Sequence, residues 1–423
     1  MNTAHLSIDY TPPIEVPYRF FLTAPVFGGL FSLLLMFAGE TLLESRWSLT
    51  MIGALHLLTI GVLLMVVIGV LFQLLPVVGG VQIPWQRKLS IGVHSSISAA
   101  LVLFTIGSLF SVTALFIPAT ILFVVALTPY LGALLVLYRK VNSSEFVTQL
   151  RFIYPFLVLF LLLGLQLLAG WGGLLSRVTR EWTHIHLLWG LGGWFTLLLM
   201  AASFQMIPMF LVTDEFPRWL RKWLIPTVAV ALYGWGIGEM VGVGLLSNLL
   251  MSVVASGLML FGVVALKLII YRKRRMVDST IHFWVIALGA MVVSGTVLLV
   301  SQWLLTDIPA WLGLFHILIV LLPMLAGSLL KITPFLVFLH LQQRAIQKAA
   351  EGGRLSPPMS LFQILPASSG RRLLYLYLSS LFLLIIAIFY LPAVHLAGFA
   401  LLLFFSWFGW IVHSCYHVYN TNA

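Results

Sequence analysis

Long apolar runs alternate with short polar or glycine-containing turns along almost the whole chain. Most runs reach about 20 residues or more, the length at which an α-helix crosses the ~30 Å hydrocarbon core of a bilayer. A transmembrane barrel strand would instead alternate polar and apolar residues over a short segment. The pattern therefore predicts an all-α, polytopic membrane protein with a single transmembrane domain over residues 1–423.

Hydropathy predicts about twelve transmembrane helices, with the turns between spans 3 and 4, 7 and 8, and 11 and 12 being very short. The predicted spans cover residues 18–43, 48–80, 90–113, 117–138, 149–171, 183–212, 222–245, 247–271, 279–305, 309–340, 373–391 and 393–418.

Three of these spans carry the same short word at equal intervals along the chain. The words are His56-Leu57-Leu58, His186-Leu187-Leu188 and His316-Ile317-Leu318. Each span then runs through an apolar segment and closes with a polar residue three positions before a proline, in the pairs Gln73 and Pro76, Gln205 and Pro208, and Lys331 and Pro334. Because these are spans 2, 6 and 10, the sequence predicts three pseudo-repeated four-helix blocks.

Composition and charge agree with a membrane protein. Apolar residues make up 61% of the chain and charged residues 8%, too few charges to solvate a globular surface. The net charge of +11 would suit a nucleic-acid partner, but most basic residues fall in alternate loops, with Arg46, Arg177 and Arg180 on the opposite side. The lipid bilayer is therefore the expected partner, with the cluster Arg272–Arg275 at anionic head groups, and no nucleic acid.

The same charge distribution predicts an orientation. Under the positive-inside rule, both termini are cytoplasmic, as are the N-terminal segment 1–17 and the long loop 341–372. The expected location is a bacterial-type inner membrane. His56, His184, His186 and His316 then lie in the outer third of the membrane.

Four histidines at matching depth suggest a cofactor site. Neutral imidazole is a common ligand of haem iron, copper and zinc, although a lone histidine in a membrane often only bonds a neighbouring helix. Cysteine is absent at this depth, and acidic residues are almost absent, which argues against structural zinc. We expect haem b, with copper as a second candidate.

Helical geometry separates two of these histidines. Residues two apart point about 200° apart on an α-helix, so His184 and His186 are expected to face different sides, one towards His56 and the other towards His316. Either is a candidate metal ligand. Glu239, within a glycine-rich run, is a candidate proton carrier or haem-edge group, while the glycines at four-residue spacing also permit close helix packing.

Histidines on helices 2, 6 and 10 of twelve, all near the outer face, resemble the haem-copper oxidase subunit I superfamily. The segment His56–Gly61, followed by Met65, Gly69 and Pro76, is also similar to the NnrS family, distant haem- and copper-containing relatives linked to nitric oxide stress. The resemblance implies that His56 and His316 hold one haem, and that His184 or His186 holds a second haem or a metal.

The sequence departs from the oxidase pattern in three places. Span 7 lacks histidine, and Leu314 stands where the first histidine of a His-x-His pair would lie. Leu188 and Gly190 occupy the positions four residues after His184 and His186, where an oxidase would carry a tyrosine. A complete oxygen-reducing centre is therefore not expected.

The expected function is haem binding, in electron transfer or in a response to nitric oxide. An electron donor or a partner subunit is then an expected partner of the protein. Whether the protein is a haem-dependent oxidoreductase stays open. Two alternatives remain. Twelve spans with cytoplasmic termini and internal repeats also describe secondary transporters, which should carry a polar substrate site near the midplane. The chain would otherwise be a cofactor-free assembly subunit.

Overall fold

The structure is a computed structural model that describes residues 10–140, 145–176, 180–273, 278–304, 308–309, 311–352 and 359–422. The side chains at 180 and 181 are not described. Most of the N-terminal segment, Arg177, the side chain of Arg180, and Arg274 and Arg275 therefore lie outside the described residues.

The described residues form α-helices with short 3₁₀ and π segments and contain no strand. Twelve helical stretches among them are long and apolar enough to cross a membrane, which confirms the predicted fold class and number of spans. Nine of these are the helices α1 (Glu15–Leu43), α4 (Gln86–Leu109), α5 (Phe116–Lys140), α6 (Glu145–Trp171), α9 (Arg218–Val241), α10 (Gly244–Ile270), α11 (Ser279–Leu304), α15 (Ala367–Phe389) and α16 (Ala393–Asn422). A 3₁₀ turn, η3 (Thr113–Leu115), leads into α5.

The three spans that carry the repeated histidine word each contain a π-helical segment. Span 2 consists of α2 (Leu49–Leu58), η2 (Thr59–Leu64) and α3 (Met65–Gly79). Span 6 consists of α7 (Arg180–Leu188), η4 (Trp189–Thr196) and α8 (Leu197–Leu211), and span 10 of α12 (Trp311–Phe315), η5 (His316–Leu321) and α13 (Leu322–Ala350). Each π segment begins at the histidine or within a turn after it. Such segments are rare and often mark functional sites.

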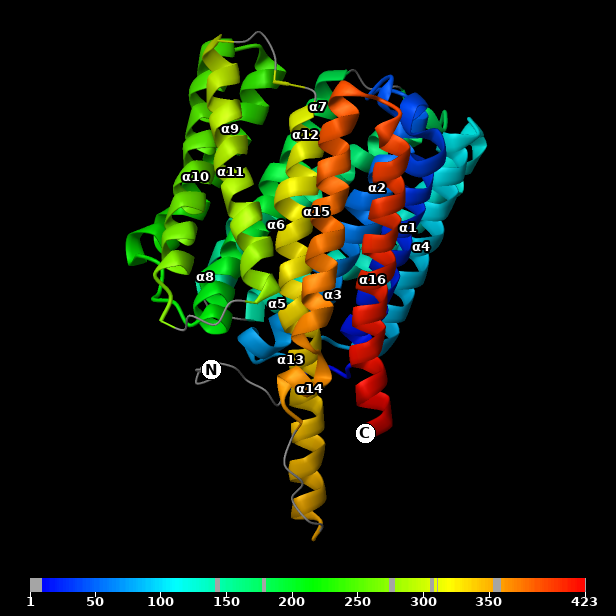
Figure 1. The fold of residues 1–423 in the computed structure, drawn as a ribbon. Coiled ribbons are helices and arrows are strands. Elements are labelled where there is room, and N and C mark those ends of the chain that lie inside the picture. The colour runs from blue at the N-terminus through cyan, green and yellow to red at the C-terminus, as the bar shows by residue number, and fades with distance from the viewer. Residues whose placement is uncertain are drawn as a thin grey trace.

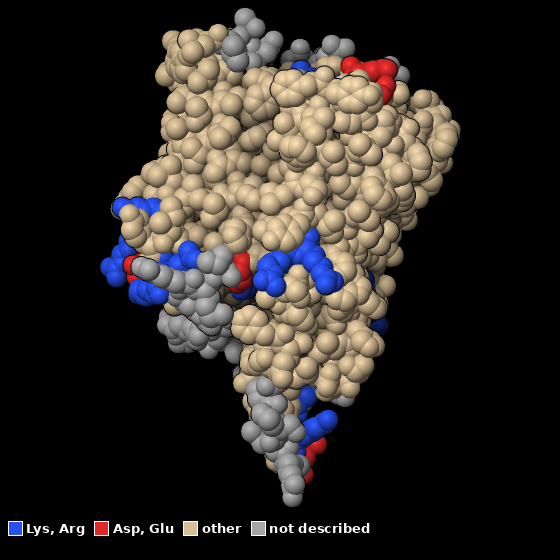
Figure 2. All heavy atoms as spheres, in the orientation of Figure 1, with Lys and Arg blue, Asp and Glu red and all other residues tan. Residues whose placement is uncertain are grey.

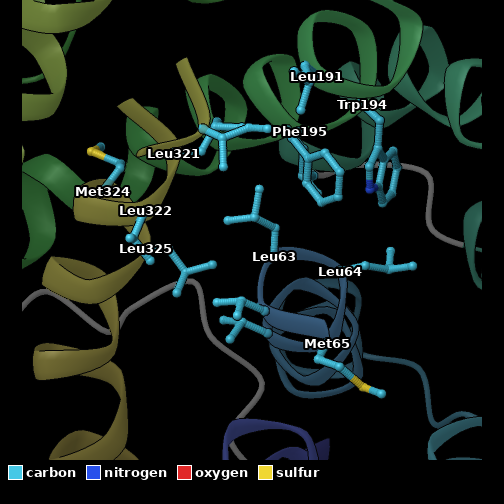
Figure 3. Close-up of a cluster of buried hydrophobic side chains, with 14 of the residues drawn as sticks. Leu63, Leu64, Met65, Leu191, Trp194, Phe195, Leu321, Leu322, Met324 and Leu325 are labelled. Carbon is cyan, nitrogen blue, oxygen red and sulfur yellow. The ribbon is translucent and has the colours of Figure 1, made fainter. Parts of the chain in front are cut away.

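The same three spans form the centre of the bundle. Within their most apolar windows, 67%, 61% and 72% of the residues of spans 2, 6 and 10 are buried, against 50% or less for the other nine. The outer helices can therefore bury one side against these three and leave the other for lipid. Figure 3 shows the core from all three central spans, with Leu63, Phe195 and Leu321 directed towards a common centre.

Basic side chains gather at one end of the bundle, here called the basic end, while the apolar surface above it carries few charges (Figure 2). Arg87 at the start of α4 forms an ion pair of 2.7 Å with Glu15 at the start of α1, and α16 ends on the same side (Figure 1). His56 and His186 lie near the opposite end, where the turns 44–48 and 172–176 connect the helices.

The predicted loop 341–372 is only partly a loop. Its first ten residues continue α13 to Ala350, and this helix projects beyond the rest of the bundle (Figure 1). A short helix, α14 (Leu361–Ile364), follows, with Ser360 and Gln363 forming reciprocal capping bonds at its start. The last residues of the predicted loop already belong to α15.

Candidate functional site

His56 and His186 come together between spans 2 and 6. Their ring centres lie 6.3 Å apart and their planes are nearly parallel, at 17°. Both side chains are partly buried. Two of the four predicted site histidines therefore lie next to each other. Each is the first residue of its copy of the repeated word.

Hydrogen bonds to backbone carbonyls hold both rings in one tautomer. The Nδ1 of His56 lies 2.7 Å from the carbonyl oxygen of Ile52, and the Nδ1 of His186 lies 2.8 Å from that of Phe160. A carbonyl can only accept, so each Nδ1 carries a proton and donates it, which leaves the lone pair of the neutral ring on Nε2. Among the described residues, neither Nε2 has a hydrogen-bond partner. A metal-binding histidine typically has this arrangement.

Aromatic rings and a glycine shape the space around the pair. Phe104 meets the ring of His56 edge-on at 5.1 Å, and Phe160 meets the ring of His186 at 5.9 Å. Gly164 on α6 lies directly against His186: a Cβ at this position would come within 2.8 Å of its Cε1. Glycine therefore provides the room that the imidazole occupies.

His184 lies apart from this pair. Its side chain is exposed and stacks on Trp47 at 5.8 Å, with the guanidinium of Arg46 4.8 Å from the same indole ring. The prediction that His184 and His186 face different sides is confirmed. The expectation that one of them faces His316 is wrong, because His186 lies against His56 and the exposed His184 stacks on Trp47 from the turn before span 2.

His316 is buried and has hydroxyl partners for both ring nitrogens. Its Nε2 lies 2.8 Å from Thr196 Oγ1 and its Nδ1 lies 3.2 Å from Ser294 Oγ. The Thr196 hydroxyl donates its proton to the carbonyl of Leu191 at 2.6 Å, so it accepts from His316 Nε2. Nδ1 then accepts from Ser294. The structure thus pairs His56 with His186 instead of His316, and His316 has no free ring nitrogen.

The described residues contain no group of three or more histidine, cysteine, aspartate or glutamate side chains that could hold a metal ion. His56 and His186 alone therefore offer two ring nitrogens at this place.

Glu239 lies exposed near the end of α9, while the glycines around it pack closely. An added Cβ would lie 2.9 Å from Leu250 at Gly234, 2.6 Å from Ser247 at Gly238, and 2.5 Å from Trp189 at Gly236. The predicted packing role is confirmed for Gly234 and Gly238 but not for Gly242, which ends α9 with a φ of 79° and has no atom within 4 Å of an added Cβ. The exposed Glu239 carboxylate points to the surface of the bundle, so nothing in its setting favours a role at the histidine pair.

A half-open pocket of about 90 Å³ lies between the three central spans, on the basic-end side of the histidines. Its walls come mainly from α3, α8 and α13, and the π segments add Leu63, Phe195 and Leu321. Among the described lining residues, only Ser203 and Ser328 are polar.

Comparison with known proteins adds no relative, since no protein-family model and no curated protein matches the chain. The site therefore rests on its own geometry. Sequence reasoning missed Thr196 and Ser294, because neither belongs to a word that repeats with the histidines. It also missed the π segments, which have no common sequence signature beyond their closeness to the histidine word.

Proposed function

We propose that the protein is a haem-binding membrane protein in which His56 and His186 would hold a b-type haem. The ring geometry is the main support. The ring centres lie 6.3 Å apart with nearly parallel planes, and neither Nε2 has a hydrogen-bond partner among the described residues, so both lone pairs would be available to hold the group.

The residues around the pair support the same role. The carbonyls of Ile52 and Phe160 fix the ring orientations and raise the basicity of each Nε2. Phe104 and Phe160 provide an apolar boundary. A bound haem would supply one-electron redox chemistry. Because two histidines of the protein would hold the iron, this arrangement favours electron transfer over binding of a substrate at iron.

We also propose where the protein lies in the cell and which proteins it is related to. The gathering of basic side chains at one end supports a cytoplasmic placement of that end in a bacterial-type inner membrane, so the histidine pair would lie towards the outer face. Histidines on spans 2, 6 and 10 of a twelve-helix bundle support a distant relationship to the haem-copper oxidase subunit I superfamily and to NnrS-like proteins, while the pairing of His56 with His186 departs from the pair of His56 and His316 that this resemblance implies.

The secondary-transporter alternative has less support. A transporter places charged or polar groups around a substrate near the midplane. The pocket at the centre of this bundle is instead lined almost entirely by aliphatic and aromatic side chains. Such a surface offers no bonds to compensate a polar substrate for the loss of its water.

The visible spectrum of the purified protein tests haem binding. Protein expressed with ample haem is measured oxidised and after dithionite reduction, and a pyridine haemochrome assay gives the haem type and stoichiometry. We expect a Soret band with one haem b. Copper detected by metal analysis in a protein without a Soret band would contradict the proposal, as would a colourless, metal-free protein.

Four variants test the ligand assignment. His56→Ala and His186→Ala are each expected to abolish the Soret band or to convert it to that of a haem with one axial ligand. His184→Ala and His316→Ala serve as matched controls that keep the wild-type band. A band that survives both ligand variants, or that is lost only in His316→Ala, would refute the assignment.

A further inference from the structure

We propose that His413 and His417 form a chelating site for one divalent transition-metal ion near the end of α16. This site is separate from the pair of His56 and His186 and does not depend on haem. Its support comes from the spacing of the two histidines, from their exposure and from their free ring nitrogens.

The two imidazole rings lie side by side on one face of α16. Residues four apart on an α-helix project from neighbouring positions of the same face. The ring centres of His413 and His417 are 6.4 Å apart, and their planes meet at 17°. Two histidines at this spacing on one helix also supply zinc ligands in H-E-x-x-H sites. One ion can therefore bind both rings through side-chain rotation alone, with the helix backbone unchanged.

Both histidine side chains are exposed. Among the described residues, no hydrogen-bond partner lies at any ring nitrogen of His413 or His417. By contrast, His340, at the same end of the bundle, has both ring nitrogens within hydrogen-bond distance of backbone carbonyls. The lone pairs of the neutral rings of His413 and His417 are therefore available to a metal.

The pair lies beyond the aromatic residues that mark the membrane surface. Trp410 stacks on Trp407 with ring centres 4.5 Å apart, and the guanidinium of Arg372 lies 5.3 Å from the ring centre of Trp407. Tryptophan and basic side chains together are typical of the interface between lipid and water. His413 and His417 follow towards the end of α16, at the basic end (Figure 1), where dissolved ions reach them.

The ligand type selects the metal. Neutral imidazole suits zinc, copper and nickel, whereas Mg²⁺ and Ca²⁺ prefer oxygen ligands. Cys415 lies between the two histidines in the chain, but residues two apart point about 200° apart on an α-helix, and this thiol is buried. The described residues contain no third histidine, cysteine or carboxylate at this place, so water is expected to complete the coordination.

Zinc titration of the untagged, full-length protein in detergent tests the site. Zn²⁺ is added in competition with a chromophoric indicator, and electron paramagnetic resonance of bound Cu²⁺ counts the nitrogen ligands. We expect His413→Ala and His417→Ala each to weaken Zn²⁺ binding roughly tenfold or more, because the second imidazole otherwise binds within the same molecule. His282→Ala, which removes another exposed histidine, is the control with full affinity. Unchanged affinity in both site variants, or a Cu²⁺ signal from one nitrogen, would overturn the proposal.

Two double variants separate this site from folding defects and from the other histidine pair. Thr421→His combined with His413→Ala restores the four-residue spacing further along the exposed end of α16. This variant should regain Zn²⁺ affinity, which a damaged fold would not. His56→Ala combined with His186→Ala should retain the Zn²⁺ binding of α16. Binding lost only in that variant would refute the proposal, whereas a protein that binds Zn²⁺ at α16 but lacks a Soret band would contradict only the haem proposal.

Discussion

His186 and His316 occupy equivalent positions in two repeats of one word, yet their hydrogen bonds are opposite. His186 donates from Nδ1 to a backbone carbonyl and leaves Nε2 without a partner among the described residues. His316 donates from Nε2 to Thr196 and accepts from Ser294 at Nδ1. The first ring keeps the lone pair of Nε2 without a partner among the described residues, and the second uses both ring nitrogens to connect η5 with η4 and α11.

The difference comes from the neighbouring helices and not from the histidine word itself. A backbone carbonyl of α6 faces His186, whereas hydroxyls from η4 and α11 face His316. A hydroxyl can donate and a carbonyl cannot, so the neighbour decides the tautomer. Repeated words can therefore mark equivalent positions in a fold without giving them one chemical role.

The largest expected effect comes from removing the space beside His186. Gly164→Ala places a Cβ within 2.8 Å of the imidazole, so the ring must shift out of line with His56. We expect haem affinity to fall by tenfold or more, measured by titrating haem into the apoprotein. Gly190→Ala, whose new Cβ would lie 3.5 Å from Phe160, is the control with near-normal affinity. Unchanged affinity in Gly164→Ala would remove His186 from the ligand set.

A second variant tests the structural role of His316. Thr196→Val preserves side-chain shape but leaves the buried Nε2–H of His316 without its acceptor, which should cost about 1–2 kcal/mol of stability. Thermal unfolding in detergent measures this loss. Thr296→Val, on the exposed face of α11, is the matched control. The haem spectrum should be that of the wild type in both, and a lost Soret band in Thr196→Val would argue that His316 is a ligand after all.

Ser294→Ala is expected to have a smaller effect on the same ring. It removes the donor to His316 Nδ1, at 3.2 Å the longer of the two bonds, so the cost should be about 0.5–1 kcal/mol. Combined with Thr196→Val, the losses should be non-additive, because both bonds hold one imidazole. Strict additivity in the unfolding data would show that the two hydroxyls do not share this partner.

The smallest effect is expected at the exposed His184. Replacing it by Ala removes a ring that stacks on Trp47 at the surface, so stability should change by about 0.5 kcal/mol or less. The Soret band should keep its position and intensity. A shifted band would show that the stack of His184 and Trp47 reaches the haem site.

The sequence predicted the helices well because their signal is local. Apolar length determines each span, and the observed bounds of span 2, Leu49–Gly79, differ by one residue at each end from the predicted 48–80. The separation of His184 from His186 followed from helical geometry. Histidine pairing could not be predicted in this way, because the partners Phe160, Thr196 and Ser294 lie on other helices.

The end of span 10 illustrates the same limit. Hydropathy falls near residue 340, where the prediction ended the span, but α13 continues to Ala350 because backbone bonding does not stop at the membrane surface. His340, the last residue of the predicted span, bonds the carbonyl of Pro12, and in the extension Arg344 stacks over Tyr419 of α16 at 4.6 Å. Hydropathy alone therefore misses this polar continuation of the helix, although Ala, Gln, Arg and Lys in residues 341–350 are good helix formers.

The π segments have a consequence for every future comparison of this chain with others. A π turn holds about one residue more than an α turn, so the helix beyond it is out of phase by about 100° with the helix before it. A helical wheel drawn through His56 and Leu74 as one cylinder would place them on the wrong relative faces. The same holds in spans 6 and 10. Deleting one residue from a π segment would therefore rotate the half of the central helix beyond it. An insertion there likewise changes the direction in which the following side chains point more than it changes the length of the helix.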